Sequence, residues 1–348
     1  MTSSPMTSSP VTSTPALSAR YDVLGLGNAI VDVLSRTDDD FLAKQAMRKG
    51  SMSLIDEARA AEIYEAMGPT VEISGGSAAN TIVGAAGFGA RAAFIGRVKD
   101  DSLGNVFAHD IRAAGVAFDT APSADGPSTG RCYVLVTPDG ERTMHTFLGA
   151  AQDLHPRDID DGTIGSAAIT YLEGYLWDPP HAKDAFRKAA VVAHDAQRLV
   201  ALSLSDAFCV DRWRDEFLHL IRSGTVDLLF CNEAELRSLY QTADFDTAVA
   251  ALRGDARRAV VTRGASGCIV VEGQKTVEAP AFPVETVVDT TGAGDLFAAG
   301  FLFATARGLG DERAARLGAL AAAEVISHLG ARPEKSLSAL AQENGLIK

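Results

Sequence analysis

Short apolar runs alternate with longer Ala-rich stretches along most of the chain. Apolar runs of this length are typical of buried strands. They lie at residues 21–27, 92–96, 168–174, 199–205, 226–231, 259–262 and 268–271. Helical patterns separate several of them, for example at 183–196 and 243–253. This alternation predicts βαβ units around a mostly parallel sheet with helices on both faces.

The last part of the chain carries two strongly helical stretches. Residues 296–308 are apolar on nearly every side, which indicates a buried helix rather than a surface one. Residues 311–328 form a second, Ala-rich helical pattern. Gly330 lies just past the end of this pattern, where a left-handed C-cap would fit.

Two stretches interrupt the alternation of strands and helices. Residues 130–148 contain a P-D-G triplet between two strand-like arms, which is a hairpin signal. Residues 35–56 are also poorly helical at their end. We infer a small antiparallel element at one edge of the core, with lid segments at about 35–56 and 118–150. A simple edge hairpin without a lid role is the alternative.

Residues 1–19 differ from the rest of the chain in composition. Ser, Thr and Pro dominate there, and MTSSP occurs twice in tandem. Such a segment cannot bury enough apolar surface to offset the entropy lost on ordering. We expect a disordered tail at 1–19, followed by one catalytic unit over residues 20–348.

The charge of the chain limits its partners. Lys and Arg number 32 and Asp and Glu number 45, which gives a net charge of −13. Nucleic-acid polymers and anionic membranes attract basic proteins, so neither is expected as a partner. No C-x-x-C pair occurs among the four cysteines, and no apolar run is long enough to span a membrane. These features favour a cytoplasmic protein with reduced thiols.

The sharpest chemical motif is D-T-T-G-A-G-D at 289–295, between a strand-like stretch at 284–288 and the predicted buried helix. Two small glycines at a helix start leave backbone N–H groups unpaired, and these groups form an anion site suited to a phosphoryl group. Asp295 lies beside that site, where it can accept the proton of an attacking hydroxyl. A first-turn Asp that only complements the helix dipole is the alternative.

A second motif, G-G-S-A-A-N at 75–80, follows a predicted polar strand at 71–74. Its small residues let a ligand approach the backbone closely. Asn80 offers both a donor and an acceptor for hydroxyl recognition. A tight turn that caps the next helix would need the same residues.

A third motif, G-L-G-N-A-I-V-D at 25–32, begins like the dinucleotide-binding fingerprint G-x-G-x-x-G. Ile30 stands where the third glycine is needed, so the fingerprint is incomplete. Asn28 and Asp32 could instead grip the hydroxyls of a polyol substrate. The G-x-G start is also compatible with a nicotinamide oxidoreductase, which is an alternative from another functional class.

Two motifs follow predicted strands in the second half of the chain. N-E-A-E at 232–235 comes directly after a strand, at the sheet edge where ligands bind in open α/β folds. Asn232 and Glu235 could organise Mg²⁺ and its waters, although a helix N-cap explains them equally well. T-R-G-A-S-G at 262–267 is a turn over which a nucleotide could lie, or only a β-turn.

In this order, the motifs resemble those of the ribokinase/PfkB family of small-molecule kinases. The resemblance covers nearly the whole chain from about residue 21 and rests on GGSAAN, NEAE, TRGASG and DTTGAGD. It implies a three-layer α/β/α core with a mostly parallel central sheet and a small β-rich lid. It also implies ATP and Mg²⁺, and phosphorylation of a primary hydroxyl.

The resemblance implies roles for residues at matching positions. Asp295 matches the catalytic base, and the amides of Gly292, Ala293 and Gly294 match the anion hole. The matching substrate contacts are Asn28, Asp32, Gly76, Asn80 and, more loosely, Arg142 on the lid hairpin. The matching ATP-side positions are Asn232, Thr262, Gly264 and Gly267, with Glu235 and Asn232 associated with magnesium through water. Asp289 and Thr291, with carbonyls near Gly330, resemble the K⁺ site of some members.

The residues within the motifs also favour one subgroup of this family. GNAIVD, GGSAAN and PDGERTMHTFLGA resemble adenosine kinases and their bacterial relatives, whereas ribokinase-like members usually carry Lys where Ser77 and Ala78 stand. This implies transfer of phosphate from ATP to the 5′-hydroxyl of adenosine. Residues 175–177 lie just after a predicted strand end and could pack against the purine, or could be ordinary apolar residues of a loop. The alternatives are a kinase for ribose, fructose or a keto-deoxy sugar acid, and a non-catalytic binding protein. Either a monomer or a homodimer is compatible with the sequence.

Overall fold

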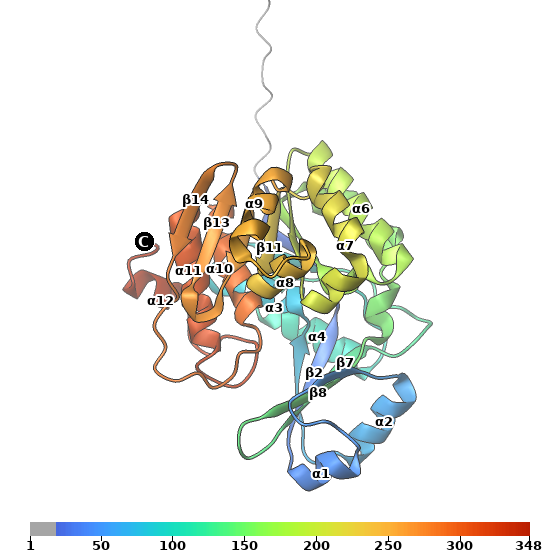
Figure 1. Ribbon diagram of the computed structural model, residues 1–348. Coiled ribbons are helices and arrows are strands. Elements are labelled where there is room, and N and C mark those ends of the chain that lie inside the picture. The colour runs from blue at the N-terminus through green and yellow to red at the C-terminus, as the bar shows by residue number, and fades with distance from the viewer. Residues whose placement is uncertain (1–18) are drawn as a thin grey trace, which may run out of the picture.

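A large sheet lies at the centre of the molecule (Figure 1). The computed structural model describes residues 19–348, so the tail predicted at 1–19 lies outside the described residues apart from Ala19. The nine strands have the order β14-β13-β12-β11-β10-β9-β1-β5-β6. They are β1 (Tyr21–Leu26), β5 (Ala92–Ile95), β6 (Val116–Ala117), β9 (Ala167–Glu173), β10 (Leu199–Ser203), β11 (Leu228–Asn232), β12 (Ala259–Thr262), β13 (Cys268–Glu272) and β14 (Lys275–Ala279). Only the β12–β13 and β13–β14 pairs are antiparallel, which confirms the mostly parallel sheet.

Helices cover both faces of this sheet because successive strand residues point to opposite sides. On β1, Val23 belongs to one buried apolar cluster and Leu24 to another. The first cluster includes α3 (Ser77–Gly87), α4 (Ser102–Ala113), α10 (Ala293–Ala306), α11 (Asp311–Val325) and α12 (Leu337–Glu343). The second includes α5 (Asp161–Gly165), α6 (Pro180–Asp195), α7 (Ala207–Arg222), α8 (Glu233–Leu239) and α9 (Phe245–Asp255). The three-layer α/β/α core is therefore present.

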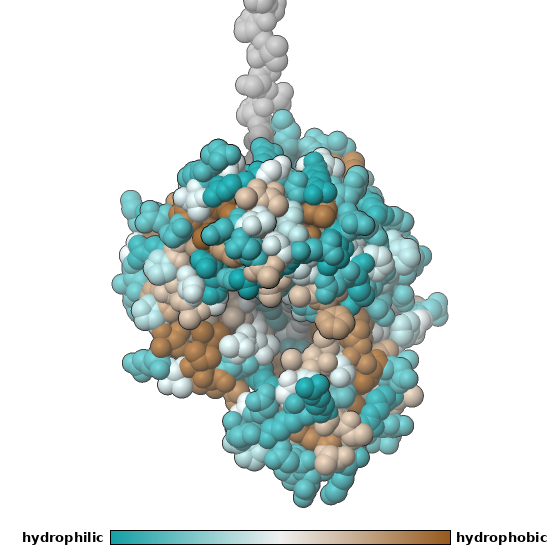
Figure 2. Space-filling model, in the orientation of Figure 1, coloured by the Kyte–Doolittle hydropathy of each residue, from teal (hydrophilic) through white to brown (hydrophobic). Residues whose placement is uncertain are grey.

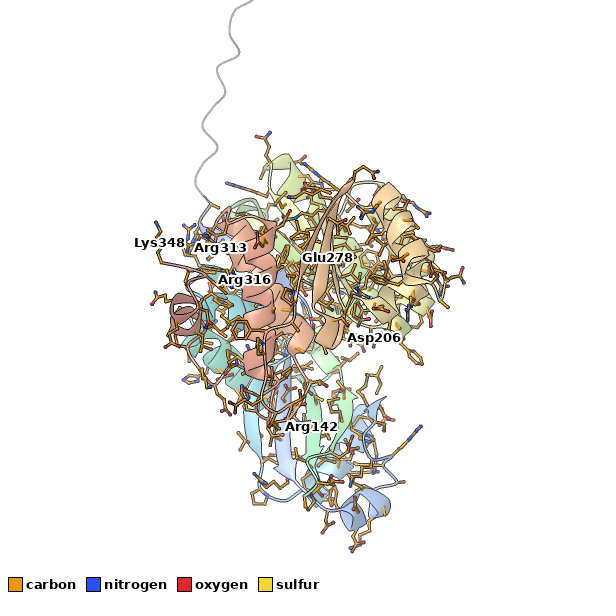
Figure 3. All side chains as sticks on the ribbon, turned by 60° about the vertical axis from the view of Figure 1, so that its left-hand side comes forward. Arg142, Asp206, Glu278, Arg313, Arg316 and Lys348 are labelled. Atoms are coloured by element: carbon orange, nitrogen blue, oxygen red, sulfur yellow. The ribbon has the colours of Figure 1, made fainter. Side chains whose placement is uncertain are left out.

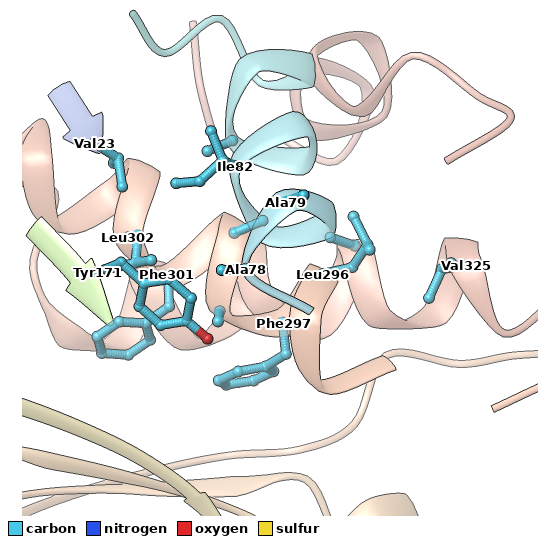
Figure 4. Close-up of a cluster of buried hydrophobic side chains, with 14 of the residues drawn as sticks. Val23, Ala78, Ala79, Ile82, Tyr171, Leu296, Phe297, Phe301, Leu302 and Val325 are labelled. Atoms are coloured by element: carbon cyan, nitrogen blue, oxygen red, sulfur yellow. The ribbon is translucent and has the colours of Figure 1, made fainter. Parts of the chain in front are cut away.

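The helix α10 lies inside the first cluster, as its apolar sequence predicts. Every residue from Leu296 to Ala304 is buried. Figure 4 shows Leu296 and Phe301 of this helix in the same cluster as Ile82 of α3 and Tyr171 of β9. A helix that is enclosed on all sides is held rigidly, so its first turn is a fixed platform for the residues it carries.

A second, five-stranded sheet forms the lower lobe in Figure 1, with the order β3-β8-β7-β2-β4. Its strands are β2 (Ile30–Arg36), β3 (Met52–Leu54), β4 (Val71–Gly75), β7 (Gly130–Val136) and β8 (Arg142–Phe147), and α1 (Asp39–Lys44) and α2 (Glu57–Ala66) accompany them. The β7–β8 hairpin has the predicted turn. The expectation of an antiparallel element is wrong for β2–β7 and β3–β8, which are parallel. Both β2 and β7 leave the core at their first residues, and therefore run in the same direction.

The alternation of residues gives the smaller sheet two different faces. Val31 and Val33 point to the side where Ala60 and Ile63 of α2 are buried. The alternate residues of β2, Ile30, Asp32 and Leu34, point to the opposite side, toward the larger lobe. That second face carries Ile30, Asp32, Leu34, Met52, Leu54, Ile73, Cys132, Val134, Arg142, Met144 and Thr146, all of which line one cavity.

Two local expectations are wrong, and the dinucleotide-binding alternative is not observed. The helix α11 ends at Val325 with Ile326 as its C-cap, so Gly330 lies in the following loop, although its φ of 106° is positive. Residues 284–288 form no strand, because the amide of Val288 donates to the carbonyl of Ile326 instead of to a sheet. After Gly27 the chain enters β2, where a dinucleotide-binding fold would begin a helix.

Two expected features concern the whole described chain. All four cysteines are free and buried. From residue 19 to the C-terminus, no helix has the length and apolar character needed to cross a membrane.

Candidate active site

A cavity of about 850 Å³ lies between the two lobes, and Figure 2 shows it as a hollow in the surface. One wall is the face of the smaller sheet described above. The other wall is formed at the carboxyl ends of β9, β10, β11 and β12 and by the start of α10, which is where open α/β sheets bind ligands. The predicted site residues that line the cavity are Asn28, Asp32, Gly76, Asn80, Arg142, Asn232, Glu235, Thr262, Thr291, Gly292, Ala293, Gly294 and Asp295.

Asp295 lies in the first turn of α10, at the cavity wall. Ser77 Oγ donates a hydrogen bond to one carboxylate oxygen (2.6 Å), and Asn80 Nδ2 donates to the other (3.1 Å). Burial has the largest effect on this carboxyl and raises its pKa to about 6, although both hydrogen bonds and the charge of Arg332 act in the opposite direction. Such a group is ionised at neutral pH and more basic than an ordinary aspartate, as a general base should be.

We expect Asp295→Asn to raise the free energy of unfolding at neutral pH by about 3 kcal/mol. Because the pKa of Asp295 rises from 3.8 to about 6 on folding, ionising this carboxyl costs free energy in the folded state. Stability is therefore lost as the pH rises between these two values, and asparagine removes the loss. Urea unfolding of both proteins at about pH 8 and about pH 4 measures the effect. A difference that persists at the lower pH would contradict the raised pKa.

The start of α10 has unpaired amides, although the Ala293 amide, which was also expected to be free, donates to the Thr290 carbonyl oxygen (3.2 Å). Gly292 is the N-cap, with φ 77° in the left-handed region, and no side chain caps the helix. The backbone amides of Gly294 and Asp295 donate to no atom of the described residues. Free amides at the positive end of a helix dipole favour an anion, so this turn can hold a phosphoryl group beside Asp295.

Glu173 is a site residue that the sequence analysis missed. Its side chain is buried at the end of β9 and accepts hydrogen bonds from Asn28 Nδ2 (2.7 Å), the Asn28 amide (3.3 Å) and the Ala78 amide (2.8 Å). It therefore fixes Asn28, whose buried Oδ1 has no hydrogen-bond partner within the described chain. Burial raises the pKa of Glu173 to about 7. Its place at the last residue of a parallel strand was the signal that could have revealed it.

Asp32 faces the same cavity from β2. Burial raises its pKa to about 6, while the charges of Arg332 and Arg142 oppose the rise. Gly75 leaves room for this carboxylate, since a Cβ atom at Gly75 would lie 2.5 Å from it. At Gly76 the φ of 100° and a distance of 2.2 Å from a built Cβ to the Asn28 carbonyl oxygen both require glycine.

Asp289 and Arg142 form a buried ion pair (2.7 Å) that joins the loop before α10 to the smaller sheet. Asp289 also accepts from the Thr291 amide (3.0 Å), the Thr291 hydroxyl (2.8 Å) and the Gly330 amide (3.0 Å). Its carboxylate is thus surrounded by donors, which suits a structural role better than that of a cation ligand. Arg142 keeps Nε and Nη2 without partners among the described residues, so these groups can bind an anion in the cavity (Figure 3).

Asn232 and Glu235 hold each other in a capping box at the start of α8. Asn232 donates from its amide (3.0 Å) and from Nδ2 (2.5 Å) to Glu235, and Asn232 Oδ1 accepts from the Glu235 amide (2.9 Å). Burial raises the pKa of Glu235 to about 7. The N-cap alternative is therefore observed, and both residues also line the cavity. Within the described residues, no group of three or more His, Cys, Asp or Glu side chains could hold a metal.

The predicted nucleotide turn follows β12. Thr262 lines the cavity, whereas Gly264 and Gly267 are not among the lining residues. Gly264 and Gly267 have φ values of 55° and 83° and form the tight turn into β13. Thr262 is the member of this motif that the structure brings to the cavity.

The part of the cavity near the smaller sheet is mostly apolar, with Ile30, Leu34, Val134 and Met144 on its wall. Tyr175 faces it from the end of β9. The prediction that Leu176 and Trp177 also lie near a purine is wrong. Both side chains pack in the second core cluster, as ordinary apolar residues would. The result is a pocket with an apolar side for a flat ring and carboxylates for hydroxyl groups.

The chain is similar in sequence to a family of kinases and to individual members of it. Residues 53–337 match the model of the pfkB family carbohydrate kinases. A curated adenosine kinase of Saccharomyces cerevisiae is 28% identical over 329 residues, which cover 88% of this chain and 94% of the yeast protein.

Two solved bacterial structures are more similar. The adenosine kinase of Sinorhizobium meliloti is 52% identical, with a TM-score of 0.87 over 94% of this chain and 100% of that chain. A probable sugar kinase of Rhizobium etli is 48% identical, with a TM-score of 0.88 and the same coverage of both chains. Both similarities span the two lobes and the cavity between them.

Proposed function

The chain belongs to the pfkB family of carbohydrate kinases, and from this premise we propose that it transfers the γ-phosphoryl group of ATP to the 5′-hydroxyl of adenosine, giving AMP and ADP. One observation carries the proposal: the half-buried carboxylate of Asp295 lies next to unpaired helix amides at the wall of a single cavity. The similarity to adenosine kinases supports the choice of acceptor.

In the proposed reaction, Asp295 accepts the proton of the 5′-hydroxyl as that oxygen attacks the γ-phosphorus. Ser77 and Asn80 hold the carboxylate in place through their hydrogen bonds. The free amides of Gly294 and Asp295, with that of Gly292, stabilise the charge that develops on the phosphoryl oxygens. The free N–H groups of Arg142 add positive charge from the smaller sheet.

Adenosine is held in the part of the cavity between the lobes. Asp32 and Asn80 bind the ribose hydroxyls, with Asn28 oriented for the same purpose by Glu173. The purine lies against the apolar face of the smaller sheet and against Tyr175. Closure of the smaller sheet as a lid excludes water and limits hydrolysis of ATP.

ATP occupies the part of the cavity near α8 and β12, where Thr262 and Asn232 lie. Mg²⁺ supplies charge neutralisation on the phosphates when bound. Asn232 and Glu235 would hold it through water, because both Glu235 oxygens already accept hydrogen bonds from Asn232. A monovalent cation such as K⁺ would need carbonyl oxygens near Thr291 and Gly330, since the Asp289 carboxylate is surrounded by donors.

We expect adenosine to be the best acceptor in a panel with guanosine, inosine, ribose and fructose. Its kcat/KM should exceed that of either sugar by at least about tenfold, because a free sugar leaves the apolar wall uncovered. ADP release at equal acceptor concentrations measures this, and Asp295→Asn protein serves as the control for contaminating kinases. If the sugars turn over well and the nucleosides do not, the chain is a sugar kinase, the alternative that the similar Rhizobium etli protein favours.

A further inference from the structure

Arg332 is a charged residue of the cavity wall to which the proposed reaction assigns no role. It lies in the loop between α11 and α12. Its Nε and Nη2 atoms donate to the carbonyl oxygen of Ser74 (3.1 and 2.6 Å), and Nη1 donates to the carbonyl oxygen of Ala79 (3.1 Å). One guanidinium thus joins the end of β4 to the first turn of α3.

Both ends of this connection are themselves fixed. Ser74 Oγ accepts from Arg332 Nη2 (2.9 Å) and donates to Asp110 of α4 (2.5 Å), which also accepts from the Ser74 amide (2.8 Å). Between the two clamped carbonyls lie the glycine turn and Ser77, and Asn80 follows directly. Ser77 and Asn80 are the two donors to the Asp295 carboxylate. The position of that carboxylate therefore depends on a segment that Arg332 holds.

Arg332 is also a half-buried positive charge among acidic groups from several elements. Asp32 on β2, Asp110 on α4 and Asp295 on α10 all favour its charged form, while burial lowers its pKa to about 10, so it stays protonated at neutral pH. Its charge lowers the pKa of Asp32 and of Asp295. Arg142 acts on Asp32 in the same direction, and the buried Glu173 carboxyl faces the same region from β9. Arg332 is the cation that acts on both aspartates.

We propose that Arg332 is a positioning residue for phosphoryl transfer: it clamps the segment that carries Ser77 and Asn80, and its fixed charge keeps the Asp295 carboxylate ionised. This role rests on the proposed function, because it acts through Asp295 as the base. A purely structural arginine would hold the loop without affecting the ionisation of the base.

Two substitutions separate the clamp from the charge. Arg332→Gln removes the charge and most donors, so we expect kcat to fall about tenfold or more and the acidic limb of the kcat/KM profile to move up by about one pH unit. Arg332→Lys keeps the positive charge but loses the guanidinium N–H groups that donate to both Ser74 and Ala79. It should retain the wild-type acidic limb while kcat remains reduced. The KM for the acceptor should change less than kcat in both variants.

Arg313→Gln is the matched control, because Arg313 is an exposed arginine of α11 that lies far from Arg142 in Figure 3 and does not line the cavity. Wild-type kinetics are expected for it. An Arg332→Gln enzyme with an unmoved acidic limb would overturn the charge role, and an Arg332→Lys enzyme with wild-type kcat would overturn the clamp. Thermal unfolding of each variant shows whether a lower kcat reflects lost folded protein. If the wild-type chain phosphorylates no acceptor, the proposed function itself fails, which is a different result from an active wild type with unaffected Arg332 variants.

Discussion

Replacing Asp295 by asparagine is expected to lower kcat roughly a thousandfold while the Kd for the acceptor changes only a few-fold. Asparagine has the same shape and can still bond to Ser77 and Asn80, so the cavity keeps its form. It cannot take the proton of the attacking hydroxyl. Steady-state kinetics give kcat, and calorimetric titration of the variant with adenosine gives the Kd.

The matched control for this substitution is Asp246→Asn. Asp246 is an exposed aspartate in the first turn of α9, so it complements a helix dipole without facing the cavity. It should keep normal turnover. If Asp295→Asn also kept near-normal turnover, Asp295 would be no more than a dipole-complementing residue and would lose its role as the base.

Gly292→Ala is expected to lower kcat/KM at least about a hundredfold, the second-largest effect that we predict. The φ of 77° at this N-cap strains any residue with a side chain, and a Cβ atom would lie 2.8 Å from the Ala331 Cα atom. Relief of that contact must move the start of α10 or the loop at Ala331. Either movement displaces the amides that are proposed to hold the phosphoryl group.

Gly308→Ala isolates the conformational part of this effect. Gly308 also has a positive φ, 65°, but it lies beyond the other end of α10 and a Cβ atom there meets nothing within 4 Å. Both variants should lose about 1 kcal/mol of stability from the strained backbone. Only Gly292→Ala should lose activity, as thermal unfolding and ADP-release assays on both proteins will test. Equal kinetics in the two variants would remove the turn at Gly292 from the proposed anion site.

The fold was largely predictable because its signals are local. The apolar runs that became β1, β9 and β12 are short, and the apolar sequence of α10 needs burial on every side. The smaller sheet was predicted less well. Its hairpin has a local turn signal, but the parallel pairing of β2 with β7 joins strands about a hundred residues apart, which no local pattern encodes.

The residues of the candidate site also fall into two groups, those that sequence motifs marked and those that only the structure revealed. The motifs marked Asp295, Asn80 and Asp32 because glycine-rich turns at strand and helix ends have few other uses. Glu173 and Arg332 belong to no motif, and each acts only through residues that are distant in the chain.

The sequence by itself determined the α/β class, the strands and helices of the core, and the turn where a phosphoryl group can bind. These features depend on residue periodicity and on the backbone freedom of glycine, which are properties of neighbours in the chain. Only the tertiary structure decided that Arg142 pairs with Asp289 and that Arg332 bridges Ser74 and Ala79. A charged or polar side chain has several potential partners, and folding selects among them by burying the pairs that leave few charges and donors unsatisfied.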